Sequence, residues 1–195
     1  MGTGGYINIG IVFNHSRQLL EVFDSIKNEL IEKGSSFNHV KYSKDIDGFE
    51  WVEQQIKNNV IHQSSFTGYY TKFILSGTFL NVGIHELSLI IHKEDQFFGF
   101  LFGINWEDVF ARHILNTQSE MVDWLIELYQ KVPYGYSFIG HEIEIEKHPN
   151  DFKTLMINNH SYPVSVIPVK GRLKIYYGEN AIDGLSDQEQ RIEFI

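Results

Sequence analysis

Apolar residues recur along this 195-residue chain in two patterns, one typical of strands and one typical of helices. Runs that are apolar throughout or at alternate positions, bounded by turn-forming residues, predict strands. The predicted strands cover residues 6–13, 37–42, 66–75, 84–92, 96–104, 136–146, 151–157 and 173–177. The stretch 161–169 contains Pro163 and Pro168, which lack backbone donors, so we expect an edge strand or an extended loop there.

Apolar residues three and four positions apart predict four helices. These helices are expected to begin at Asn14 or Ser16, at Asp47, at Asn105 and at Thr117. Gly34 and Pro133 should end the first and the last of them, because glycine favours the C′ position and proline cannot continue a helix. The second helix is expected to bury one stripe of side chains, namely Phe49, Val52, Ile56 and Val60.

The order of these elements predicts the fold class. Strands and helices alternate at first, three strands then follow one another closely, and further strands come after the last long helix. This mixture favours an α+β fold, with a mainly antiparallel β-sheet covered by about four helices. No linker or internal repeat interrupts the chain, so residues 1–195 are expected to form one domain. Two tightly packed halves are the alternative.

Composition and charge narrow the classes of function. The chain has 16 basic and 25 acidic residues, a net charge of −9 at pH 7, and no cysteine. Direct binding of nucleic acid is not expected, because it requires an excess of lysine and arginine. Without cysteine there is no disulfide, thiol or zinc–thiolate chemistry. The N-terminus lacks a signal-peptide pattern and no apolar run reaches about 18 residues, so we expect a cytoplasmic protein without a membrane segment.

The negative charge is concentrated between residues 105 and 151. This part holds three basic and nine acidic residues, a net charge of −6. On the predicted helix, one flank carries Glu120, Asp123 and Glu127. On the predicted strand, one face carries Glu142, Glu144 and Glu146. These two rows are candidates for an acidic face that attracts a basic partner, and the alternative is a surface that is merely solvated.

A tryptophan beside two further acids adds to these candidates. Trp106 lies in the first turn of its predicted helix and is followed by Glu107 and Asp108. Trp51, Trp106 and Trp124 all occupy helix positions consistent with the core, and of the three we expect Trp106 to be partly exposed and to serve as an interface anchor.

No motif of catalysis or metal binding is found. His85 and His141 are each followed by glutamate but do not form HExxH, and neither a phosphate-binding loop nor a GxSxG turn is present. We therefore predict no catalytic residue, no metal and no cofactor. In the run 97–103, Phe98, Phe100 and Phe102 share one strand face, which favours core packing over an aromatic ligand groove.

Three stretches together resemble a known family. They are GYINIGIVFNHSRQLLEVFDSI, FGFLFGINWEDVF and WLIELYQKVPYGYSFIGHEIEIE, within residues 5–146. In this combination the chain resembles bacterial polymorphic-toxin immunity proteins, in particular the Imm64-like family. The resemblance implies a small cytoplasmic α+β protein, made beside a toxin gene, that binds the catalytic domain of a cognate toxin and blocks it without doing chemistry.

Many such toxin domains are nucleases with basic surfaces, so a basic nuclease is one expected partner for an acidic face. Two other classes stay open on the residues alone. One is an enzyme with an unrecognised site, and the other is a partner-binding domain unrelated to toxins.

Overall fold

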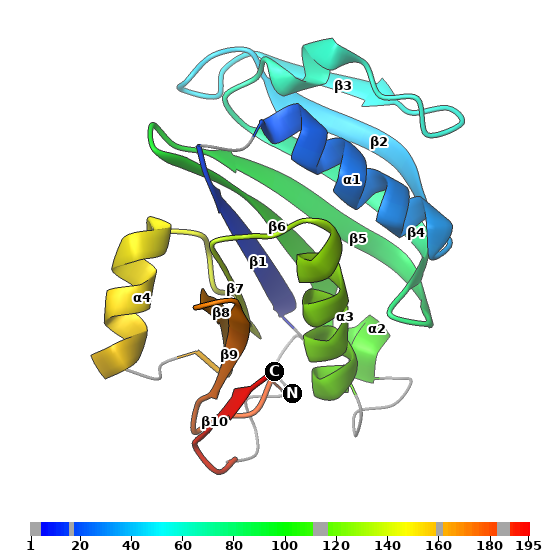
Figure 1. The fold of residues 1–195 in the computed structure, drawn as a ribbon. Helices are drawn as coiled ribbons and strands as arrows, with labels where there is room; N and C mark the ends of the chain where they lie inside the picture. Colours follow the sequence, from blue (N-terminus) through cyan, green and yellow to red (C-terminus); the bar gives the residue numbers. More distant parts are fainter. Residues whose placement is uncertain (1–4, 16–17, 111–116, 159–161, 183–187) are drawn as a thin grey trace.

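The described residues form one antiparallel sheet of ten strands with four α-helices (Figure 1). The computed structural model describes residues 5–15, 18–110, 117–158, 162–182 and 188–195. The strand order is β10-β9-β8-β7-β1-β6-β5-β4-β2-β3, and every pairing is antiparallel. The predicted α+β class with a mainly antiparallel sheet is confirmed.

The strands differ in length from four residues to twelve. They are β1 (Tyr6–Asn14), β2 (Ser35–Ser43), β3 (Trp51–Gln55), β4 (Thr71–Phe79), β5 (Val82–Lys93), β6 (Phe97–Asn105), β7 (Tyr136–His141), β8 (Val164–Val169), β9 (Arg172–Tyr177) and β10 (Arg191–Phe194). The helices are α1 (Leu19–Glu32), α2 (Trp106–Phe110), α3 (Thr117–Lys131) and α4 (Pro149–Asn158), with a 3₁₀ turn at Gln63–Phe66.

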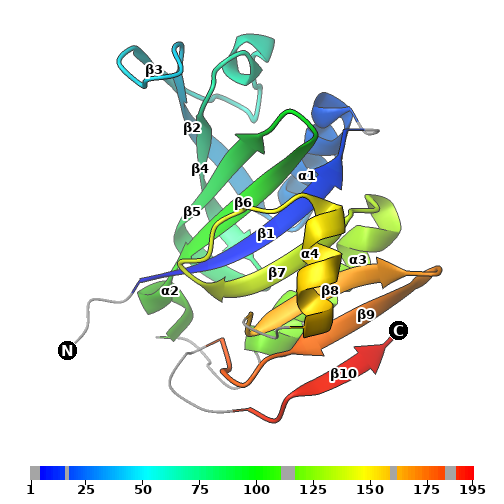
Figure 2. The same ribbon diagram turned by 90° about the vertical axis from the view of Figure 1, so that its left-hand side faces the viewer.

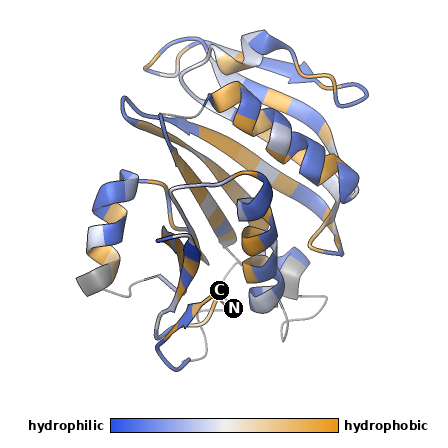
Figure 3. Ribbon diagram, viewed as in Figure 1, coloured by the Kyte–Doolittle hydropathy of each residue, from blue (hydrophilic) through white to orange (hydrophobic). Residues whose placement is uncertain are grey.

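The two faces of the sheet are covered differently. Helices α1 and α3 lie on one face, over the larger hydrophobic core (Figure 1). Strand β1 turns Ile9 and Ile11 to that core and Val12 to the opposite face. There, a smaller core packs under α4, which lies near β7 and β8 (Figure 2). In Figure 3 the central strands carry much of the hydrophobic colour, as expected for strands with a core on each face. On the second face, no described helix lies over β2, β4 and β5, and we call this area the open sheet face (Figure 2).

The phenylalanine-rich strand β6 is a core strand. Phe98, Phe100 and Phe102 are all at most 1% exposed, and the Phe98 ring stacks on Phe13 at 5.3 Å between centroids. Phe102 meets Trp124 of α3 edge to face at 5.3 Å. The prediction of core packing is therefore confirmed, and these rings form no ligand groove.

The predicted helix at 47–60 is wrong. Residues Trp51–Gln55 form the edge strand β3, which pairs with β2, and Phe49 is 85% exposed instead of buried. Trp51, expected in the core, is 42% exposed. Because the run is short, its apolar spacing fits a helix and a strand equally well. Pairing with β2 makes it a strand.

The strand predicted at 136–146 ends early, at His141. Glu142 adopts a positive φ of 51°, which ends the pairing with β1 and turns the chain back over the sheet. We call residues 142–147 the acidic segment. Although this segment is no strand, Ile145 is buried while the glutamates on either side of it are exposed.

The strand predicted at 151–157 is also wrong, because this stretch belongs to helix α4. Pro149 occupies the first helical position, where its missing N–H is not needed. Phe152 and Met156, one helical turn apart, are both fully buried against the sheet. Helical spacing thus buries the same apolar residues that a strand would bury on one of its faces.

Strand β8 lies between β7 and β9, so the expectation of an edge position or a loop at 161–169 is wrong. Its pairing with β7 stops at Val166, and Pro168 lies beyond that point. The proline therefore removes no bond of that ladder. On this side of the sheet the edge strand is β10, which pairs with β9.

The remaining helices agree with the sequence except at their ends. Helix α1 ends before Gly34, whose φ is 96°, as expected. Asn14 belongs to β1 and does not begin the helix, and Ser16 lies outside the described residues. Strand β4 begins at Thr71, later than predicted, because Phe66 belongs to the 3₁₀ turn Gln63–Phe66 and residues 67–70 form bends.

Candidate interaction surface

The two predicted acidic rows lie on opposite sides of the sheet. Glu120, Asp123 and Glu127 belong to α3, whose apolar residues pack into the larger core. Glu142, Glu144 and Glu146 belong to the acidic segment, whose Ile145 packs into the smaller core. The structure therefore does not bring the six acids together into one face.

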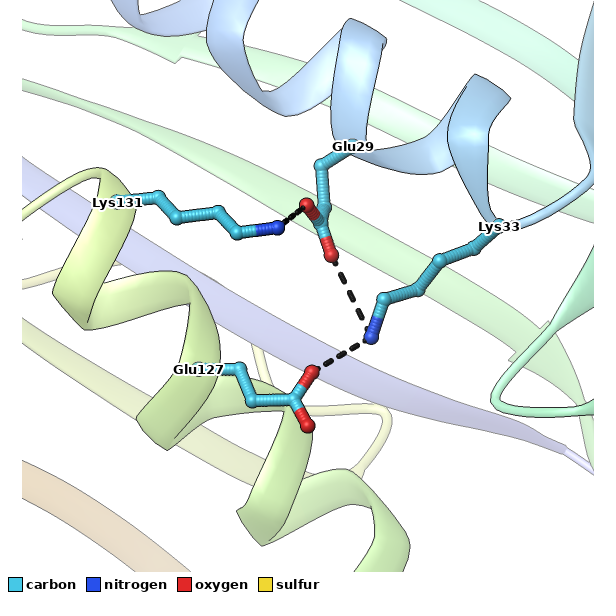
Figure 4. A network of polar contacts seen from close by, with 4 residues as sticks. All are labelled: Glu29, Lys33, Glu127 and Lys131. Atoms are coloured by element: carbon cyan, nitrogen blue, oxygen red, sulfur yellow. Dashed lines mark hydrogen bonds and ion pairs between the residues drawn. The ribbon is translucent and has the colours of Figure 1, made fainter.

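The row on α3 is partly used within the molecule. Glu127 accepts a hydrogen bond from Lys33 of α1, with 2.7 Å between Nζ and Oε2 (Figure 4). Lys33 also lies 3.4 Å from Glu29, and Lys131 of α3 donates to the other oxygen of Glu29. This network, which joins α1 to α3, takes Glu127 out of the set of unpaired acids.

The network sets the ionisation of its buried member. The Glu29 side chain is 4% exposed, and burial by itself would raise its pKa. The hydrogen bonds and charges of Lys131 and Lys33 outweigh burial and hold the pKa of Glu29 below its ordinary value. The hydrogen bond that Lys33 donates to Glu127 in turn raises the pKa of Lys33. Both shifts favour the charged forms of Glu29 and Lys33, so this buried contact is an ion pair at neutral pH.

Helix α2 lies beside the start of the acidic segment. The Trp106 ring is 5.0 Å from that of His141, the residue before Glu142. Asn105 Oδ1 accepts the Glu107 N–H at 2.9 Å and so caps the helix. Trp106 is half-buried, as predicted, and Glu107 is exposed while Asp108 is half-buried.

The acidic segment is fixed to the sheet. Asn8 Nδ2 of β1 donates to the Ile143 carbonyl at 3.1 Å, and the Tyr136 hydroxyl donates to the Lys147 carbonyl at 2.7 Å. A Cβ at Gly99 would lie 2.7 Å from Ile145 Cδ1, so this glycine leaves room for the segment. The glutamates are therefore held in place by the backbone and by apolar packing.

Two shallow grooves extend from the acidic segment across the open sheet face. The first, of about 270 Å³, is lined by Glu142 and Glu144 and by Lys72 of β4. The second, of about 760 Å³, also includes Lys72 and reaches Trp51 and Tyr70. Lys72 lines both grooves, so the two lie next to each other on this face.

Glu144 affects the ionisation of groups on this face. Burial raises the pKa of Tyr70, and the charge of Glu144 raises it further. Burial lowers the pKa of His92, against the opposing charges of Glu144 and Glu94. Glu144 also lines the first groove together with Lys72, so it lies close to the open sheet face.

Comparison with known proteins gives one result. The family model described as Immunity protein 64 matches residues 3–188. The chain belongs to the Immunity protein 64 family. The resemblance predicted from the three sequence stretches is thus confirmed. Neither the curated proteins nor the solved structures contain a match to this chain.

In this Immunity protein 64 family member, sequence reasoning missed one group of exposed residues. Five large exposed apolar side chains lie near the place where β2, β3 and β4 meet at one end of the sheet. They are Ile46, Phe49, Trp51, Tyr69 and Tyr70, exposed by 77%, 85%, 42%, 59% and 37%. We call them the apolar cluster. Four of them line the second groove, and Phe49 lies in the same loop as Ile46. The sequence feature that could have indicated this cluster is that Phe49 and Trp51 stand close to three acids. These acids are Asp45, Asp47 and Glu50.

Two further observations on this Immunity protein 64 family member concern metal binding and membrane-spanning helices. Within the part of the chain that the structure describes, no three His, Asp or Glu side chains gather in a group that could hold a metal ion. The described helices include none that is long and apolar enough to cross a membrane.

Proposed function

We propose that this protein binds the catalytic domain of a cognate bacterial toxin in the cytoplasm and neutralises it by stoichiometric blocking, without doing chemistry. Membership of an immunity protein family supports the toxin as partner. The observation that carries the mode of binding is the row of exposed glutamates on the acidic segment. A basic toxin surface, such as that of a nuclease, is the complementary partner.

The acidic segment is a better candidate than the row on α3. Among the ion pairs of the described residues, Glu127 pairs with Lys33, whereas Glu142, Glu144 and Glu146 take part in none. Like charges at alternate positions repel one another and raise the free energy of the unbound protein. A basic partner would neutralise these charges and so remove the repulsion. The segment is also fixed, so little conformational entropy is lost on binding.

The test combines binding and protection. The C-terminal domain of the toxin encoded beside this gene is co-expressed with the protein, and both cell survival and complex formation are measured. Reversal of Glu142 and Glu144 to lysine should lower the association rate about tenfold or more at low salt, since attraction between opposite charges speeds encounter.

The matched comparison reverses Glu120 and Asp123 to lysine on the other side of the sheet. This pair of substitutions changes the net charge equally and should lower the rate much less. Equal rates for both variants and the unchanged protein would show that the acidic segment is not part of the interface. Failure of the unchanged protein to bind or protect would overturn the proposed function itself.

A further inference from the structure

We infer that the apolar cluster is the anchor of the toxin interface and receives a protein surface in which an apolar side chain is flanked by lysine or arginine. This inference rests on the proposed function and adds a second, apolar part to the interface. The groove that the cluster lines adjoins the groove of Glu142 and Glu144, because Lys72 lines both, so the cluster lies close to the acidic segment.

The exposure of the cluster requires an explanation. Single exposed apolar residues are normal, but a contiguous patch of large ones on a soluble domain marks an interaction site. Here Phe49 and Ile46 keep 85% and 77% of their surface in water. Tryptophan and tyrosine are the residues enriched where interfaces gain most of their binding energy. The cluster supplies one Trp and two Tyr within a groove.

The loop that carries Ile46 and Phe49 is ordered by its own hydrogen bonds. Asp45 accepts the backbone N–H groups of Phe49 at 2.9 Å and Glu50 at 2.5 Å. These bonds lower the pKa of Asp45, so the carboxylate stays charged. The Trp51 indole N–H donates to the Gly48 carbonyl at 2.6 Å, and Gly48 adopts a φ of 72°. An exposed apolar loop that is already ordered loses little entropy on binding.

The tyrosine side of the cluster is fixed as well. Lys93 Nζ donates to the carbonyls of Phe66 and Gly68, both at 2.6 Å, and so holds the chain that enters β4. The Tyr69 N–H donates to the Ser43 carbonyl at 3.1 Å. The ring of Tyr70 meets that of Trp51 edge to face at 5.4 Å. Two segments far apart in sequence thus present one preformed surface.

Charge identifies the flanking groups of the partner as basic. Asp47 and Glu50 are exposed beside the cluster, and the ion pairs of the described residues include neither. Lys41 Nζ lies 4.9 Å from the centre of the Trp51 ring, so this indole already accepts a cation. The Lys41 charge is itself balanced by Glu53 at 3.1 Å. The loop that carries the two most exposed members of the cluster, residues 44–50, contains three acids and one basic residue, Lys44, so its net charge of −2 favours a basic partner.

The test measures binding to the purified C-terminal domain of the toxin encoded beside this gene. The variant is Ile46→Ala with Phe49→Ala, whose side chains are too exposed to support folding. We expect Kd to rise about 10- to 100-fold, as for truncation of central apolar anchors. The matched control is Phe194→Ala, a 59% exposed phenylalanine on β10 at the other edge of the sheet, with a change in Kd below about twofold.

The outcomes separate this inference from the proposed function. If the unchanged protein binds and the double variant binds as tightly, the cluster is not the anchor, and the proposed function stands. If the unchanged protein does not bind the toxin domain, both fail. If the variant keeps its toxin affinity but converts a dimer into a monomer in sedimentation, the cluster binds a second copy of this chain and the inference is overturned.

Discussion

At the scale of single residues, the same kind of group has opposite roles according to its surroundings. Glu29 is buried and held ionised by two lysines, so it joins α1 to α3. Glu144 is exposed and unpaired among the described ion pairs, and its charge acts on Tyr70 and His92 across the open sheet face. The sequence shows both only as glutamates, because burial depends on neighbours that are distant in the chain.

The first prediction concerns Glu29. Replacement by Gln should lower the free energy of unfolding by about 1–3 kcal/mol, because charge-assisted hydrogen bonds are lost while the two lysines regain water. Urea denaturation measures the change. Asp24→Asn in the same helix removes the exposed pair with Lys27 and should change stability by less than about 0.5 kcal/mol.

The pH dependence of this difference checks the cause. The pKa of Glu29 in the folded state is below its ordinary value of 4.5. Its carboxylate therefore stabilises the fold fully above the ordinary pKa, and this contribution is lost as pH falls through the lowered pKa. The stability difference between the unchanged protein and the Glu29→Gln variant should shrink below about pH 4. A difference that is constant from neutral to acid pH would argue for packing as the cause.

At the scale of elements, one glycine determines whether the acidic segment can lie on the sheet. Gly99 on β6 faces Ile145, and an added Cβ would also lie 3.0 Å from the Ile11 carbonyl oxygen. Ile145 and the backbone of β1 thus leave no space for a side chain at this position. The segment that presents the glutamates is therefore coupled to the packing of the central strands.

We predict that Gly99→Ala lowers the free energy of unfolding by about 1–3 kcal/mol through overpacking. It should also weaken toxin binding, because Ile145 is displaced. Shortening the opposing side chain with Ile145→Val in the same protein should recover part of the loss, which a double-mutant cycle in urea would measure. Strictly additive effects would show that the added methyl group does not press on Ile145.

At the scale of the whole molecule, one sheet separates two cores. The larger core lies under α1 and α3 and the smaller one under α4, and β1 and β6 contribute side chains to both. We propose that residues 1–195 form a single domain, because neither core can lose these central strands without exposing the other.

This proposal predicts one cooperative unfolding transition. In a variant with Trp51→Phe and Trp106→Phe, the fluorescence of Trp124, 2% exposed, reports the larger core, while far-ultraviolet circular dichroism reports the whole sheet. The two signals should follow the same curve in urea. Separate midpoints would instead support two halves that unfold one after the other.

The local pattern of the chain is sufficient for the elements that it can bury in one way only. Strand β6 is apolar on both faces, with Phe98, Phe100 and Phe102 on one of them, and α3 has a long apolar stripe that ends before Pro133, so both are predictable with their core residues. Family membership is also predictable from three stretches of sequence. These features depend on local periodicity, because a residue's position in a helix or strand sets the face on which it lies.

Long-range packing sets the exposure of Phe49 and Trp51, the turn of the chain at Glu142, and the separation of the two acidic rows. Pairing with β2 makes β3 an edge strand, and the positive φ of Glu142 sends the acidic segment across the sheet. The order of strands then places α3 and that segment on opposite faces. Such relations join residues far apart in the chain, so they follow from tertiary contacts and not from the local pattern.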